Sequence, residues 1–133
     1  MGCFKDINEA REYFKGDKFA ASNGITIDDL YDGGCVCSVE IRDDHRNALG
    51  GIMGGLIFTL ADFAFAVASN NDHRPCVSLD SDIRFLSTSN GSVLTAKASI
   101  VKSGRTTNVI SVIVTDESGK ETALFTGTGY KLK

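Results

Sequence analysis

Residues 45–72 read HRNALGGIMGGLIFTLADFAFAVASNND, and the expected fold of the 133-residue chain follows from this segment. From residue 54 to residue 69 nearly every position is apolar, which predicts a long helix that stops at the polar cluster 70–72. A helix that is apolar on almost every face must be covered on most sides, so we expect a strongly curved sheet to wrap around it. The length also approaches that of a membrane span, but the glycines and the central Asp62 favour a buried helix of a soluble protein.

The rest of the chain supplies the strands for such a sheet. Within residues 6–19, apolar residues at helical spacing predict one helix, which ends at Gly16. Alternating apolar and polar residues predict a strand over residues 35–41, before the long helix. Four further strands joined by short turns follow, and because short turns join antiparallel neighbours, we expect them to form a meander. These four strands cover residues 77–85, 94–100, 109–114 and 122–132.

The expected fold class is therefore α+β, with a long central apolar helix wrapped by a curved antiparallel sheet of five to six strands. The length fits a single domain over residues 1–133, whose residues 1–20 form an N-terminal helical segment. Fourteen basic and seventeen acidic side chains give a net charge of −3, which argues against a nucleic-acid partner. The N-terminus has no apolar leader, so we expect a cytoplasmic protein that is not bound to a membrane.

The cysteine pattern argues against a metal site. Cys35 and Cys37 are separated by one residue, a spacing that fits neither a zinc knuckle nor a redox pair. Since only His45 and His73 could supply imidazole ligands, we expect no metal and no redox cofactor. Residues two apart on a strand share one face, so the two cysteines are expected in the core or half-buried.

Asp62 is the residue of the long helix that least fits its surroundings. It lies eight residues after Gly54, too late to cap the start of the helix, and its neighbours are almost all apolar. Such surroundings disfavour the charged form of a carboxylate and make it a stronger base than an aspartate in water. The alternative is a structural aspartate, satisfied by a backbone group or by a partner across an interface.

The glycine run that precedes the helix, residues 50–55, suggests a second functional element. Backbone N–H groups at a helix start are unpaired, and without side chains a ligand carbonyl or phosphate can approach them closely. Close packing of the glycines against a neighbouring element is the simpler explanation. Gly54 and Asp62 are about 12 Å apart along the helix axis, so one helix cannot easily serve one reacting carbonyl with both. If they act together, we expect a dimer in which Gly54 of one chain faces Asp62 of the other.

The residues around this run resemble a known family. Residues 45–55 follow the pattern H-x-N-x-x-G-x-x-M-G-G, and Leu-Ala-Asp occupies residues 60–62. This combination resembles the signature of the phenylacetate-degradation (PaaI-type) hotdog thioesterases, H-x-N-x-x-G-x-x-H-G-G with an aspartate eight residues after the first glycine of the pair. The likeness covers residues 25–132 and includes residues 77–80 and 102–106.

The resemblance implies the hotdog fold and the hydrolysis of acyl-coenzyme A thioesters to a free acid and coenzyme A. Asp62 would deprotonate the attacking water or attack the thioester itself, and the backbone N–H of Gly54 would polarise the thioester carbonyl. Asn47 would help to hold the carbonyl or the water, and Ser78 would assist the water from the next strand. Coenzyme A enters as part of the substrate, and no other cofactor is implied.

The resemblance also implies a homodimer with two equivalent sites, paired into a homotetramer. One subunit would supply Asp62 and Ser78, and its partner would supply Asn47 and Gly54. The implied contacts to the substrate and to the coenzyme A phosphates are Met53, Gly55, Gly104, Arg105 and Thr106.

The chain departs from the family at Met53, which replaces the histidine of the H-G-G motif. This change motivates an alternative function, a hotdog protein that binds acyl-coenzyme A without hydrolysing it. A hotdog dehydratase is a third hypothesis, but its chemistry needs a histidine beside the acid, and neither His45 nor His73 belongs to the start of the helix. We interpret His45 as a hydrogen-bond partner that fixes its loop rather than as a general base. The sequence does not specify the acyl group or the carrier.

Overall fold

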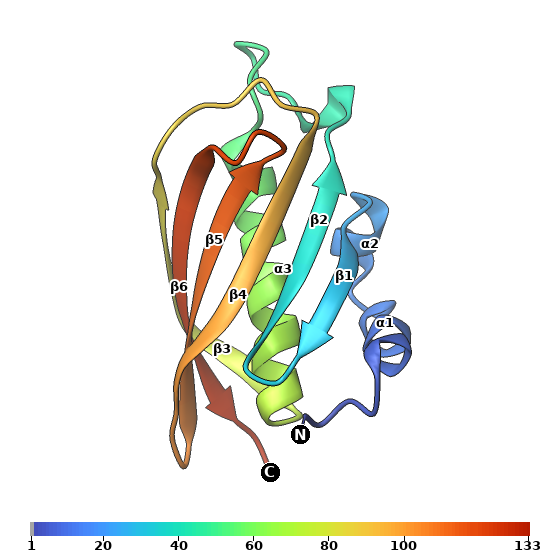
Figure 1. Ribbon diagram of the computed structural model, residues 1–133, viewed down its shortest axis with the longest axis vertical. Helices are drawn as coiled ribbons and strands as arrows, with labels where there is room; N and C mark the ends of the chain where they lie inside the picture. Colours follow the sequence, from blue (N-terminus) through green and yellow to red (C-terminus); the bar gives the residue numbers. More distant parts are fainter. Residues whose placement is uncertain (1) are drawn as a thin grey trace.

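Six antiparallel strands curve around one long helix in the computed structural model, which describes residues 2–133. The strand order is β1-β2-β4-β5-β6-β3, and helix α3 lies against the concave face of the sheet (Figure 1). This arrangement confirms the α+β class and the hotdog architecture. The elements are α1 (Ile7–Phe14), α2 (Lys18–Ser22), β1 (Thr26–Tyr31), β2 (Gly34–Glu40), a 3-10 turn (Asp43–His45), α3 (Gly54–Asp72), β3 (Cys76–Phe85), β4 (Val93–Ser103), β5 (Thr107–Asp116) and β6 (Glu121–Lys131).

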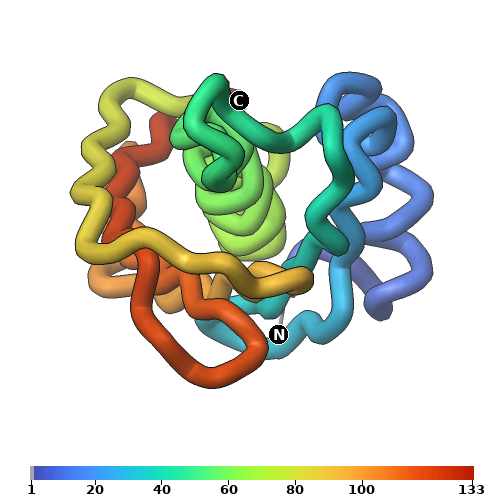
Figure 2. Tube along the Cα trace, turned by 90° about the horizontal axis from the view of Figure 1, so that it is seen from above, coloured from blue at the N-terminus to red at the C-terminus, as the bar shows by residue number. Residues whose placement is uncertain are grey.

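The core lies between α3 and the concave face of the sheet, and Figure 2 shows the chain curving around α3. The side of α3 that faces the sheet is fully buried, because its residues pack on the inward-facing residues of five strands. Cys35 and Cys37 on β2 are also fully buried, as expected from their spacing. The fully buried residues on the two sides of this contact include Leu60, Ala61, Ala64 and Val67 from α3 and Ala96, Ile110, Val112 and Phe125 from the sheet.

The long helix exists as predicted, but it does not stop at the polar cluster. It begins at Gly54 and continues through residues 70–72 to Asp72, with Pro75 shortly after its end. The side chains of this cluster bind other elements: Asn70 pairs with the backbone of Cys76, and Asp72 accepts a hydrogen bond from Asn108. Polar residues that usually end a helix are therefore held in its last turn by tertiary hydrogen bonds.

The expected meander is wrong. Strand β3 pairs with β6 at one edge of the sheet, while β4 pairs with β2 and β5 in its middle. The connection over residues 86–92 is too long for a tight hairpin, and it passes over the ends of β6 and β5 (Figure 1). Of the four strands after α3, only β4, β5 and β6 follow one another as neighbours.

Two further expectations near the N-terminus need correction. The sequence was expected to form one strand before the long helix, but two strands form there, joined by a turn in which Gly33 has φ of +87°. The helix expected to end at Gly16 ends at Phe14, and a second helix that was not predicted, α2, starts at Lys18. No helix within residues 2–133 is long and apolar enough to cross a membrane.

Candidate active site

Asp62 lies on the side of α3 that faces away from the sheet. Its neighbours on that side, Gly55, Phe58, Thr59 and Ala66, are also not fully buried, in contrast to the side that packs on the sheet. The carboxylate forms no hydrogen bond with any residue in the described part of the chain. The one strongly polar residue in the middle of the helix is thus placed where another molecule can reach it.

Asp62 lines a cavity of about 220 Å³, whose opposite wall is formed by α2. Burial raises the pKa of the Asp62 carboxyl above its usual value, and the negative charge of Asp17 raises it further. The direction agrees with the prediction that this acid is a stronger base than an aspartate in water. The lining residues are Asp17, Lys18, Phe19, Ala20, Thr59, Asp62 and Phe63.

The glycines at the start of α3 open onto two different spaces. A Cβ on Gly54 would lie 3.1 Å from the ring of Phe85, whereas a Cβ on Gly55 would meet no atom within 4 Å. Gly54 lines a cavity of about 220 Å³ with Phe85, and Gly55 lines one of about 360 Å³ with Met53. Both amides belong to the first turn of the helix, where no intrahelical carbonyl is available to them.

Within one chain, the structure does not bring the two proposed reacting groups together. Gly54 and Asp62 line different cavities, one beside β3 and the other beside α2. The spacing along the helix predicted this separation. A single substrate carbonyl could meet both groups only if they came from two different chains.

Asn47 holds the loop before α3. Its side-chain oxygen accepts hydrogen bonds from the backbone N–H groups of Leu49 and Gly51, at 3.0 and 3.1 Å. Its own N–H also bonds to the carbonyl of Gly51. Because the loop uses the oxygen, only the amide nitrogen of Asn47 remains for the role suggested by the resemblance.

His45 is fixed in the same loop, as the sequence analysis proposed. Its Nδ1 accepts a hydrogen bond from the backbone N–H of Arg42 at 3.0 Å, which leaves the ring proton on Nε2. Burial, followed by the positive charge of Arg42, lowers the pKa of His45, so the ring is neutral at pH 7. It lines the cavity of Gly55 and Met53, although it belongs to the 3-10 turn before the loop and not to α3.

The remaining predicted residues lie away from the Asp62 cavity. Ser78 is exposed on the edge strand β3, where its hydroxyl bonds to that of Ser81. Gly104, Arg105 and Thr106 form the turn between β4 and β5, at the end of the molecule opposite the start of α3 (Figure 1). One chain therefore does not gather these residues around Asp62.

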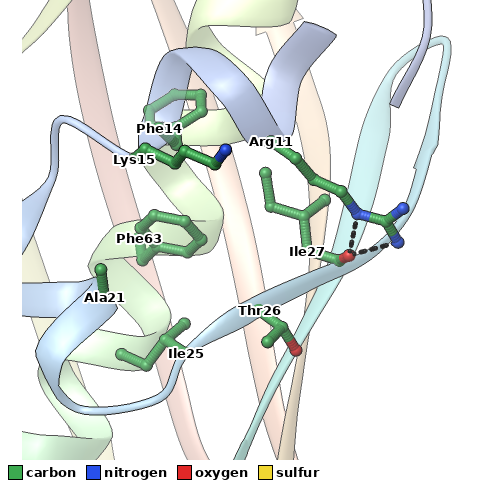
Figure 3. Close-up of a pocket in the computed structure, with 8 residues that line it drawn as sticks. All are labelled: Arg11, Phe14, Lys15, Ala21, Ile25, Thr26, Ile27 and Phe63. Carbon is green, nitrogen blue, oxygen red and sulfur yellow. Dashed lines mark hydrogen bonds between the residues drawn. The ribbon is translucent and has the colours of Figure 1, made fainter. Parts of the chain in front are cut away.

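A further cavity lies beside Phe63, between α1, α2 and β1, with a volume of about 200 Å³ (Figure 3). Arg11 and Lys15 are the cations that line it, but two guanidinium N–H groups of Arg11 donate to the carbonyl of Ile27 (Figure 3), and Lys15 pairs with Glu12. The other lining residues are mostly apolar, and no carboxylate is among them. This cavity therefore offers packing space but no acid or base.

Sequence reasoning missed the contribution of α2, because it predicted one helix that ends at Gly16 and no second helix after it. The pair Gly16-Asp17 is a usual signal for the end of one helix and the start of the next, and it could have revealed this wall. Within residues 2–133, no group of three or more His, Cys, Asp or Glu side chains is placed to hold a metal ion.

Comparison with known proteins places this geometry in a family. The model of the family described as the thioesterase superfamily matches residues 49–123. This chain belongs to that superfamily. Its matched region contains both the glycine run and Asp62.

Several relatives of this thioesterase-superfamily chain carry more specific names. It is 30% identical to the acyl-coenzyme A thioesterase PaaI of Escherichia coli over 129 residues, which are 96% of this chain and 92% of that protein. It is also 30% identical to human acyl-coenzyme A thioesterase 13, over 71% of this chain and 69% of that protein.

Solved structures agree with this placement. The E. coli PaaI structure superposes with a TM-score of 0.88 at 29% identity, covering 93% of this chain and 91% of that one. A hypothetical thioesterase from Streptococcus pneumoniae, solved with coenzyme A, has a TM-score of 0.81 at 30% identity and covers 88% of this chain and 94% of that one. The likeness to the PaaI-type hotdog thioesterases is confirmed.

Proposed function

We propose that this protein is an acyl-coenzyme A thioesterase, which hydrolyses a thioester to a carboxylic acid and coenzyme A. The observation that carries the proposal is the half-buried carboxyl of Asp62 on the side of α3 that faces away from the sheet. Burial raises the pKa of this carboxyl. The names of its relatives, acyl-coenzyme A thioesterase PaaI and acyl-coenzyme A thioesterase 13, support the substrate class.

The reaction follows from the roles of two groups. The Asp62 carboxylate takes a proton from a water molecule, and the water oxygen attacks the thioester carbonyl. The Gly54 N–H donates a hydrogen bond to the oxyanion that forms, because it is an unpaired donor at the positive end of the helix dipole. The carbon–sulfur bond then breaks, and the leaving thiolate takes the proton from Asp62. Direct attack by Asp62, with hydrolysis of the resulting anhydride, is the alternative route.

The site is formed by two copies of the chain, with Asp62 and Ser78 from one subunit and Asn47 and Gly54 from its partner. The edge strand β3 supports this assembly, because it pairs with β6 on one side only. Its apolar residues Val77, Leu79 and Phe85 are 46%, 61% and 55% exposed. An open strand edge with exposed apolar side chains is a usual surface for pairing with another chain. Two such dimers form the tetramer.

Coenzyme A contacts belong to the turn between β4 and β5. Arg105 is an exposed cation on this turn, and Gly104 and Thr106 flank it. Its guanidinium suits the phosphate groups of coenzyme A, because it can donate two parallel hydrogen bonds to them. Met53 and Gly55 border the substrate at the start of α3, where their cavity opens.

The test is a panel of acyl-coenzyme A and acyl-carrier-protein thioesters with detection of the free thiol. We expect the wild type to release thiol from at least one substrate and Asp62→Asn to release it far more slowly. Met53→His should preserve or raise the rate, since Met53 is 55% exposed and its replacement disturbs no packed core. The proposal is wrong if no thioester is turned over, or if Asp62→Asn hydrolyses as fast as the wild type.

Met53 favours a second candidate, a protein that binds acyl-coenzyme A without turnover, since it replaces the histidine of the family motif. Saturable binding with no thiol release from any substrate would support this candidate. A dehydratase is less well supported, because His45 and Asp62 line different cavities and the Nε2 of His45 is buried. A hydration assay on enoyl thioesters tests it directly.

A further inference from the structure

Asp17 lies between α1 and α2, at the position where a side chain usually caps the start of a helix. Its side chain forms no such cap bond with α2. The residue lines the same cavity as Asp62, together with Phe19 and Thr59. An acid at a capping position that does not cap is therefore placed against the one acid of the long helix.

The charged groups around this cavity are few. Asp17, Lys18 and Asp62 are the lining residues that carry charge. Of the cations on the neighbouring α1, Arg11 is bonded to the carbonyl of Ile27, and Lys15 pairs with Glu12 at 2.7 Å. The sheet strands contribute none of the lining residues, because they pack on the opposite side of α3 through apolar side chains.

Both acids respond to this environment in the same direction. Burial raises the pKa of Asp17, and burial followed by the charge of Asp17 raises the pKa of Asp62. Asp17 is the more exposed of the two, so it ionises first and is negative when Asp62 titrates.

We propose that Asp17 is a positioning residue for the hydrolysis: α2 forms one wall of the catalytic cavity, and the charge of Asp17 repels that of Asp62 across it. The repulsion makes Asp62 take a proton from the attacking water more readily, without any contact between Asp17 and the substrate. Lys18 on the same wall limits the net negative charge that the incoming substrate meets. The inference rests on the proposed role of Asp62 as the base.

The first test is the pH dependence of kcat in Asp17→Asn, on a thioester that the wild type hydrolyses. Asparagine caps helices as well as aspartate does, so α2 is expected to form. Asp62 must be ionised to act as a base, and removing the repulsion lets it ionise at lower pH. The acidic limb of the profile therefore moves to lower pH, while kcat at the alkaline plateau falls by no more than about threefold, as expected for a weaker base.

Glu12→Gln is the matched control, because it removes the same charge from an exposed position on α1 that does not line the cavity. Its acidic limb should coincide with that of the wild type. An unchanged limb in Asp17→Asn, or an equal movement in Glu12→Gln, would overturn the inference. If Asp17→Asn folds poorly, Asp17→Ser removes the charge and retains a capping side chain.

A second measurement does not depend on turnover. Titration of the Asp62 carboxyl by ¹³C NMR, assigned with Asp62→Asn, should give a lower midpoint in Asp17→Asn than in the wild type. Equal midpoints would contradict the inference even if the enzyme is a thioesterase. A lowered midpoint in a protein that hydrolyses no thioester would instead confirm the coupling and reject the proposed function.

Discussion

The two aspartates of α3, Asp62 in its middle and Asp72 in its last turn, have opposite surroundings. Asp72, in the last turn, accepts hydrogen bonds from Ser103 at 2.8 Å and Asn108 at 3.0 Å, with Lys131 at 3.4 Å. Burial alone would raise the pKa of Asp72, but these hydrogen bonds and the charge of Lys131 lower it. Within residues 2–133 no group donates a hydrogen bond to Asp62, and burial, followed by the charge of Asp17, raises its pKa. An aspartate that accepts hydrogen bonds from other elements anchors the helix, whereas an aspartate without such donors remains available to act as a base.

The largest expected difference separates Asp62→Asn from Asp72→Asn. Loss of a positioned base should lower kcat at least about a hundredfold in Asp62→Asn. Asp72→Asn should keep kcat within about threefold, since its partners lie at the anchored end of the helix. Initial rates on the best thioester measure both. Equal losses of kcat in the two variants would contradict the contrast between the two aspartates.

A smaller loss of rate is expected from Gly54→Ala. The added Cβ would lie 3.1 Å from the Phe85 ring, so either the ring or the first turn of α3 must move by a few tenths of an ångström. Displacement of the oxyanion donor should lower kcat/KM about tenfold, which corresponds to about 1.4 kcal/mol. The double variant Gly54→Ala/Phe85→Ala provides room for the Cβ and should recover part of the rate. No recovery would mean that the ring contact is not the cause.

Asn108→Ala tests the last turn of α3, and the quantity that it is expected to change is the free energy of unfolding instead of the rate. Asn108 is fully buried, and its amide donates to Asp72 and to the carbonyl of Ser69. Removing this donor from buried acceptors should lower the free energy of unfolding by about 1–3 kcal/mol, as measured by urea denaturation. Ser103→Ala is the control: it removes an exposed donor to Asp72 that water can replace, so its loss should be under about 1 kcal/mol. Equal losses would show that burial is not what matters here.

The sequence predicts the surroundings of Asp62 but not those of Asp72. Asp62 stands out because it interrupts an apolar pattern, and that local signal indicated both its position and the direction of its pKa shift. Asp72 was expected in a turn, because its helical state depends on donors from β4, β5 and β6 that no local pattern reveals.

The same distinction explains the errors in the fold. The central helix and most strands follow from the spacing of apolar residues, which is a local property. The pairing of β3 with β6 depends on a long connection and on which strand edge is free. Neither can be predicted from the alternation of apolar and polar residues along a strand. The wall that α2 builds against Asp62 was missed for a similar reason, since it depends on how a short helix packs on α3.

The smallest expected effect is the pH dependence of stability, and its sign differs between the two acids. The ordinary pKa of each carboxyl is 3.8. The stability from Asp72 is present above that value and is lost as the pH falls through its lowered folded pKa. The folded state is instead weakened as the pH rises through the raised pKa of Asp62.

Thermal unfolding from pH 3 to pH 8 measures this difference. At pH 7, Asp62→Asn should be more stable than the wild type and Asp72→Asn less stable, with both differences shrinking toward pH 3. A destabilised Asp62→Asn at pH 7 would mean that Asp62 is satisfied in the assembled protein after all.

Phe85 belongs to the free edge of the sheet, yet its ring covers one side of Gly54. A strand that docks along this edge would therefore also change the space around the Gly54 amide. In the proposed dimer, association and turnover are therefore linked through this ring. Specific activity should consequently fall on dilution, and a substitution at Phe85 should alter the dilution midpoint and the turnover number together.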